Sequence, residues 1–269
     1  MRKLNVILLA LAVMFSATTI AHPGAHRSIE ELDELLAKNP AEPALLIARG
    51  SLHTYSGQWE QAERDLALAM KTGNKINVTF ELARLCFHTG AYKKALDFID
   101  QYIGSNPDYA PAFLMKARIA EASQQKDIAV KSYRTYFEKA ANPHPGDYLA
   151  SAQLLSSIGT SGIARAIDIL DAGINEIGLI PQLQRYAMKL ELDRGEQEKA
   201  INRWHSLKHQ LGESPRYKIT LAQLLMLTHK ITEARQMTKA VRSQLSKLKK
   251  TPANDALARK LSELERQLG

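Results

Sequence analysis

The chain has 269 residues, of which 45% are apolar and 24% are charged, and these proportions exclude a protein that is disordered throughout. Cys86 is the only cysteine, which excludes an intramolecular disulfide and a zinc site built from cysteine pairs. The formal net charge is +8, and it is concentrated near one end, because residues 201–269 hold 14 Lys and Arg against 5 Asp and Glu. The functional interpretation of a basic C-terminal third is attraction to an acidic partner or an anionic surface, and the favoured interpretation is a solvated helix face.

The first 21 residues have the pattern of a secretory signal peptide. Arg2 and Lys3 provide a basic start, residues 6–15 are an unbroken apolar run, and the segment ends in the small residue Ala21. The apolar run has ten residues, whereas a helix that spans a bilayer needs about 20. We therefore expect cleavage after Ala21, export to a bacterial-type periplasm, and a mature chain without a membrane span.

An internal repeat follows. Alanine recurs in a similar setting at intervals of 33, 34, 37, 34 and 34 residues, at Ala62, Ala95, Ala129, Ala166, Ala200 and Ala234. The residue four positions later, one helical turn along the same face, is apolar in five of the six units. Glycine stands five residues before three of these alanines, at Gly57, Gly90 and Gly195. This pattern predicts a helix, a tight turn and a second helix in each unit.

These motifs resemble the tetratricopeptide repeat (TPR) family, whose 34-residue unit carries apolar, small and aromatic residues at set positions. In the first unit the matching residues are Leu46, Gly50, Gly57, Trp59, Ala62 and Leu66. The second unit matches at Ala83, Gly90, Tyr92, Ala95, Ile99 and Pro107, and later units match more weakly. The resemblance implies an all-α fold, a right-handed superhelical α-solenoid of about six helix-turn-helix repeats with capping helices.

The expected organisation is one solenoid domain. After the signal peptide (1–21) we place an N-terminal tail and capping helix at 22–42, the solenoid at 43–250 and a C-terminal capping helix at 251–269. The repeats are expected at 43–75, 76–109, 110–146, 147–180, 181–214 and 215–250, with possible flexing at 142–146.

Both ends carry sequences suited to capping the stack. Ser28 and Glu31 form a capping box that predicts a short helix to Lys38, with Leu32, Leu35 and Leu36 covering the first repeat. Residues 254–268 have leucine at helical spacing, which predicts a second helix that closes the other end.

The sequence carries no phosphate-binding loop, dinucleotide fingerprint or His-Glu-x-x-His motif. Residues 159–162 (Gly-Thr-Ser-Gly) are one residue short of a nucleophile elbow and fall at an expected turn of repeat four. Cys86 falls where a small buried residue is expected. We therefore predict a protein that is not an enzyme and uses no cofactor.

Two pairs of histidines leave a metal-dependent enzyme open as a less favoured alternative. His205 and His209 are four residues apart, so both could reach one metal from a helix face, but no third ligand is evident and Arg203 and Lys208 repel cations. His22 would become the new N-terminus, with His26 nearby. A solvated surface pair and a terminal tail are the favoured interpretations.

The resemblance also implies a binding surface, because the first helices of TPR units line a concave groove. The positions that face this groove map to Asn77, Phe80, Arg84, Phe87, His88, Arg118, Tyr148, Arg185, Lys189 and Arg216. Aromatic side chains beside guanidinium groups would suit an extended acidic peptide. The alternative is that Phe80 and Phe87 pack into the helix stack and the arginines are solvated. Arg84 and Leu114 stand where the carboxylate-clamp variety of the family has asparagine and lysine, which departs from C-terminal carboxylate recognition.

The leading functional hypothesis is a non-catalytic scaffold that binds another protein, or an acidic peptide, in this groove. The alternative is an adaptor for an anionic surface that acts through the basic stretch 242–250. Nucleic acid is the partner least expected for an exported protein.

Overall fold

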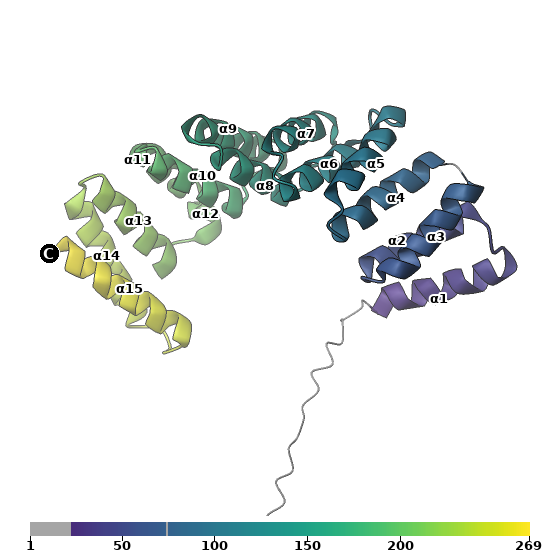
Figure 1. Ribbon diagram of the computed structural model, residues 1–269. Coiled ribbons are helices and arrows are strands. Elements are labelled where there is room, and N and C mark those ends of the chain that lie inside the picture. The colour runs from purple at the N-terminus through teal and green to yellow at the C-terminus, as the bar shows by residue number, and fades with distance from the viewer. Residues whose placement is uncertain (1–22, 74) are drawn as a thin grey trace, which may run out of the picture. The chain divides into compact units, whose positions relative to one another are not determined.

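The computed structural model describes residues 23–73 and 75–269, and this part of the chain contains fifteen helices and no strand (Figure 1). The predicted signal peptide and His22 lie outside the described residues. Contacts divide the chain into two compact units, one ending at Pro107 and the other beginning at Asp108. The predicted point of flexing at 142–146 lies inside the second unit.

The first unit holds five helices. They are α1 (Pro23–Lys38), α2 (Pro43–Tyr55), α3 (Trp59–Thr72), α4 (Lys75–His88) and α5 (Tyr92–Ser105). Helix α2 packs against α3 and α4 packs against α5, so that each pair is one repeat, while α1 packs on α2. The predicted N-terminal capping helix is therefore present.

The second unit holds ten helices. They are α6 (Ala110–Ala122), α7 (Lys126–Lys139), α8 (Pro145–Ser156), α9 (Thr160–Ile177), α10 (Pro181–Asp193), α11 (Gln197–Ser206), α12 (Lys208–Leu211), α13 (Pro215–Leu227), α14 (Ile231–Leu245) and α15 (Pro252–Leu268). The helix pairs α6 with α7, α8 with α9, α10 with α11 and α13 with α14 form four repeats, and α15 packs on α13 and α14. The two units together confirm the predicted all-α repeat fold.

The alanine repeat marks the core of every helix pair. All six alanines are 0% exposed, and the residues four positions later are 0 to 3% exposed. Small residues let paired helices approach closely: a Cβ atom at Gly50 in α2 would lie 2.9 Å from Leu66 Cγ in α3. Alanine therefore recurs in the sequence because only a small side chain fits where the paired helices pack closely.

The turns inside five of the six repeats share one backbone conformation. Gly57, Gly90 and Gly195 have φ values of 73°, 77° and 74°, in the left-handed region that favours glycine. Gln124 and His229 occupy the same position in repeats three and six, with φ values of 61° and 59°. Repeat four differs, because Gly159 (φ 106°) directly precedes α9 and the next three residues already lie in this helix. The turn predicted at residues 159–162 therefore ends at Gly159, and the rest of that prediction is wrong.

Helix α1 begins earlier than its predicted capping box, whereas α15 begins within the predicted range 251–269. Helix α1 starts at Pro23, so Ser28 lies inside the helix and the predicted capping box is wrong. Among the α1 side chains that the structure describes (29–38), Ile29 and Leu36 are buried, whereas Leu35 is 45% exposed. Helix α15 starts at Pro252 and is capped by Thr251, whose hydroxyl accepts the amide hydrogen of Asn254.

Candidate binding surfaces

In the first unit, the guanidinium of Arg84 makes hydrogen bonds to side chains of its own chain. Its Nη1 donates to Glu81 Oε2 at 2.8 Å and to Ser51 Oγ at 3.1 Å. The guanidinium lies 4.9 Å from the ring centre of Tyr55 and 5.1 Å from that of Phe80. Only 14% of its side chain is exposed, and its contacts join α4 to α2. This is contrary to the expectation from the sequence that Arg84 binds a ligand carboxylate.

The other predicted residues of α4 form a partly exposed aromatic surface. Asn77 is exposed, Phe87 is half-buried, and His88 stacks on Trp59 with ring centres 5.8 Å apart. Burial lowers the pKa of His88 below its ordinary value of 6.5, and the positive charge of Arg84 acts in the same direction. This histidine is therefore favoured in its neutral form.

In the second unit, Arg118 is also engaged. Its Nη2 donates to Asp147 Oδ1 at 2.9 Å, and the hydroxyl of Tyr136 donates to Asp147 Oδ2 at 2.9 Å. Asp147 is only 5% exposed, so this pair fixes α8 against α6 and α7. Arg118 therefore compensates a buried carboxylate of its own chain.

Tyr148 is a core residue and not a groove contact, contrary to the prediction. It is 1% exposed, stacks on Phe137 with ring centres 4.3 Å apart, and donates its hydroxyl to Glu176 Oε2 at 2.6 Å. Burial and this hydrogen bond raise the pKa of Tyr148 well above its ordinary value. The tyrosine forms part of one wall of an apolar pocket of about 480 Å³ between α7, α8 and α9.

Arg185 and Arg216, by contrast, come together around an open pocket of about 490 Å³, which we name the C-terminal basic pocket. Its lining residues come from α10, α11, α13 and α15, and are Arg185, Met188, Trp204, Arg216, Ile219, Thr220, Ala253, Ala256, Leu257 and Lys260. They include three cationic side chains and no acidic one. Among the described residues, Arg185, Arg216 and Lys260 have no hydrogen bond or ion pair with a protein group.

The local sequence explains how these side chains are positioned. Pro181 and Pro215 both occupy the start of a first helix, 34 positions apart, where a missing N–H costs nothing. Ser214 caps α13 by accepting the amide hydrogen of Tyr217 at 3.3 Å. Trp204 is fixed in the pocket wall because its Nε1–H donates to the backbone oxygen of Tyr217 at 3.1 Å.

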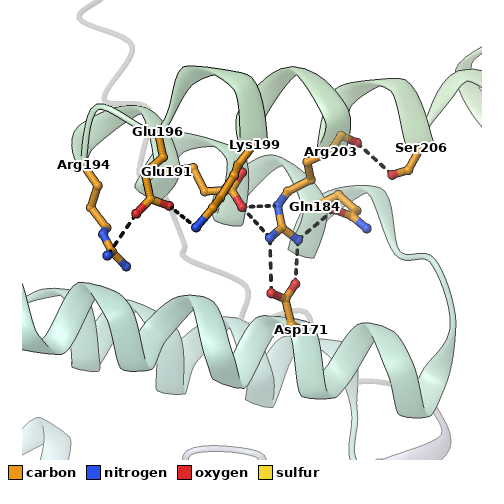
Figure 2. Close-up of polar contacts among 8 residues, drawn as sticks. All are labelled: Asp171, Gln184, Glu191, Arg194, Glu196, Lys199, Arg203 and Ser206. Carbon is orange, nitrogen blue, oxygen red and sulfur yellow. Dashed lines mark hydrogen bonds and ion pairs between the residues drawn. The ribbon is translucent and has the colours of Figure 1, made fainter.

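A polar network holds α10, which carries Arg185, in place (Figure 2). Arg203 in α11 donates to Asp171 Oδ1 in α9 at 2.6 Å, to Glu191 Oε1 at 2.6 Å and to Gln184 Oε1 at 3.1 Å. Burial disfavours the charged guanidinium, but the hydrogen bonds to Glu191 and Asp171 outweigh this effect and raise the pKa of Arg203. The network thus joins three helices and fixes one side of the pocket.

Lys189, the remaining predicted residue, does not line the C-terminal basic pocket. Its Nζ lies 3.3 Å from Asp193 Oδ2 on the same helix, and its side chain is 64% exposed. An exposed pair of this kind contributes little to stability.

The structure also places the candidate metal and nucleophile residues. His205 lies in α11 and accepts or donates a hydrogen bond at 3.2 Å with the hydroxyl of Tyr217, whereas His209 lies in the separate short helix α12. Within the described ranges, no group of three or more His, Cys, Asp or Glu side chains is placed to hold a metal ion. Cys86 is half-buried, and burial raises the pKa of its thiol.

The sequence reasoning missed the contribution of α15 to the pocket. Leu257 and Lys260 lie in the capping helix, outside the repeats, so no repeat position could assign them to a binding surface. The only signal was the amphipathic pattern of residues 254–268, which predicted a helix but not which residues would face the open side.

These features define a helical-repeat protein that has an open, positively charged pocket. No protein-family model matches the chain, and no curated protein matches its sequence. Solved structures do: the C-terminal part of a TPR protein from Cytophaga hutchinsonii has a TM-score of 0.63 and 11% identity, covering 84% of this chain and 92% of that one.

Two further structures are similar over most of their length. A tetratricopeptide repeat protein from Parabacteroides merdae has a TM-score of 0.50 and 17% identity, covering 88% of this chain and 92% of that one. PilF from Pseudomonas aeruginosa has a TM-score of 0.51 and 11% identity, covering 91% and 99%. The chain therefore has the tetratricopeptide-repeat fold. In the described part of the chain, no helix is both long and apolar enough to cross a membrane.

Proposed function

We propose that the protein is a non-catalytic interaction scaffold that binds an acidic segment of a partner protein in the C-terminal basic pocket. The observation that carries this proposal is the set of Arg185, Arg216 and Lys260 around one pocket, with no acidic lining residue. Cations held near one another repel, and an incoming anion relieves this repulsion.

The chemistry of the walls indicates the form of the ligand. Met188 and Leu257, which are partly exposed, provide apolar surface beside the charges. A peptide with a carboxylate close to an apolar side chain would satisfy both, because arginine pairs with carboxylates through two parallel hydrogen bonds. Extended peptide fits best, since the pocket is open to solvent and its volume accommodates only a few side chains.

The same lining supports binding rather than catalysis. Thr220 is its only hydroxyl-bearing residue, and the lining contains no histidine, cysteine or carboxylate that would activate a nucleophile. A preformed surface on packed helices loses little conformational freedom on binding, so a few anchoring contacts suffice. We further propose that the protein acts after export, in the periplasm, as the pattern of residues 1–21 indicates.

Trp204 provides a direct test, because it lies in the pocket wall and the chain has only one other tryptophan, Trp59. In a Trp59→Phe background, fluorescence would be recorded during titration with a soluble peptide of alternating leucine and glutamate. We expect a saturable change in Trp204 emission, and none with the corresponding leucine and lysine peptide.

The key variant is Arg185→Glu with Arg216→Glu, which should weaken binding of the acidic peptide at least tenfold, as expected when charge-paired contacts are reversed. The matched control, Arg64→Glu with Arg259→Glu, changes the net charge equally at exposed arginines outside the pocket. If both double variants bind equally, net charge alone attracts the peptide and the pocket is not the site.

A further inference from the structure

A second candidate surface in the second unit is the turn between α14 and α15, none of whose residues lines the C-terminal basic pocket. Residues 246–251 form this turn, which we name the lysine turn, and Lys247, Leu248, Lys249 and Lys250 are all exposed. Leu248 is 43% exposed. Leu248 is distinguished from the other exposed apolar side chains by its place between three exposed lysines.

The turn is a fixed structure. The amide of Leu248 donates to the backbone oxygen of Leu245 at 3.1 Å, and Asn254 Nδ2 donates to the backbone oxygen of Lys249 at 2.8 Å. Thr251 then caps α15. Backbone and cap contacts therefore hold the turn, and within the described residues none of its three lysine side chains has a hydrogen bond or ion pair with a protein group.

The core of the last repeat does not need Leu248. Val241, Leu261 and Leu264 are 0 to 3% exposed and already close the contact between α14 and α15. Arg242, just before the turn, is paired with Glu265, so the charges free to act outward are those of the turn itself. Asp255, in the first turn of α15, is the one carboxylate beside Lys249 and Lys250 in the shallow pocket there.

We propose that the lysine turn docks on an anionic lipid surface, with the three ammonium groups at the headgroups and Leu248 at the boundary of the acyl chains. Each lysine near an anionic membrane adds a favourable electrostatic contribution, and a short apolar side chain gains by leaving water. Leu248 decides between membranes and soluble polyanions, because a phosphate or sulfate polymer offers no apolar layer to receive it.

This proposal is independent of the function proposed for the basic pocket, and a vesicle assay separates the two. The protein as purified from the cell would be sedimented with phosphatidylcholine vesicles that contain or lack phosphatidylglycerol. We expect binding only to the anionic vesicles, and weaker binding as salt is added.

The variant Lys247→Gln, Lys249→Gln, Lys250→Gln should weaken vesicle binding about a hundredfold, since each lysine contributes about fivefold. Leu248→Ser should weaken it roughly fivefold without changing its salt dependence. The matched control, Lys71→Gln, Lys93→Gln, Lys94→Gln, removes the same charge from exposed lysines of the first unit and should bind within about twofold of the parent.

Three results would overturn the proposal. The first is equal binding of the lysine-turn variant and the control, and the second is binding that does not require phosphatidylglycerol. The third is binding to dextran sulfate or an oligonucleotide that depends on the same lysines while Leu248→Ser has no effect on vesicles. Peptide titration of the lysine-turn variant through Trp204 should be unchanged, so failure here leaves the pocket hypothesis to be judged separately.

Discussion

At the scale of single residues, the most consequential group is the guanidinium of Arg203. Its side chain is 13% exposed, and its partner Glu191 is 3% exposed. Removing one member of a buried pair leaves the other charge without compensation, which costs much more than the net contribution of the pair. The ion pair between Glu196 and Lys199, also shown in Figure 2, is different, because the side chain of Lys199 is 68% exposed.

Arg203→Ala should therefore lower the free energy of unfolding by about 3 kcal/mol. Lys199→Ala, which breaks an exposed ion pair on the same helix, should lower it by less than about 1 kcal/mol. Urea denaturation followed by circular dichroism measures both. Similar losses for the two variants would show that Glu191 finds another partner or water when Arg203 is removed.

Residue type alone did not separate binding arginines from structural ones. Arg84 and Arg118 matched the groove pattern as well as Arg185 and Arg216, yet the first two are held by Glu81 and Asp147. Asp147 is 29 positions from Arg118 in the sequence, so only the folded structure shows that this arginine is paired with a carboxylate of its own chain. For the same reason, charge reversal at Arg118 would test stability rather than binding.

At the scale of the helix and turn, the repeats use one left-handed position in two ways. Gly90 meets the requirement for a positive φ without strain, and no atom lies within 4 Å of where its Cβ would be. Gln124 and His229 adopt the same conformation with a side chain, which costs about 1 kcal/mol relative to a right-handed residue.

Gln124→Gly and His229→Gly should each stabilise the protein, by roughly 0.5 kcal/mol, since relief of the backbone strain exceeds the added freedom of glycine in the unfolded chain. Gly90→Ala should destabilise it by about 1 kcal/mol through backbone conformation alone, because the site has space for a methyl group. Thermal unfolding of the three variants measures this. If Gln124→Gly destabilises the protein, the glutamine side chain makes a contribution larger than its backbone strain.

The alanine repeat predicted the helix pairs well, because close packing admits only small residues at those six positions. The helix starts were harder to predict. Ser28 has the right neighbours for a capping box, but α1 begins at Pro23, since local capping signals compete with proline and with packing on α2. Likewise, a left-handed glutamine at position 124 carries no signal that distinguishes it from any other turn residue.

At the scale of the molecule, contacts cluster within two units, and the second contains the basic pocket, the Arg203 network and the lysine turn. In repeat proteins each unit gains most of its stability from its nearest neighbours, so a set of repeats with its own core can fold alone. The second unit has such a core around Tyr148, Leu170 and Leu183, which are 0 to 1% exposed.

Residues 108–269 produced alone should therefore keep the helical circular dichroism expected for their length and should bind the acidic peptide within about threefold of the full chain. Residues 181–269 should fold poorly, because the cut removes Asp171 from Arg203 and Leu170 from the core. Cooperative melting of the shorter fragment, with peptide binding intact, would contradict this assignment of the core.

The network around Arg203 also limits how such an array can be rearranged during evolution. Asp171 belongs to one repeat and Arg203 to the next, and Arg84 likewise reaches Ser51 across 33 positions. These two boundaries between repeats thus have different polar contacts. Deleting or moving the repeat that holds Asp171 would remove one of the two carboxylates that pair with Arg203, so the repeats on either side of this boundary are not interchangeable with the others.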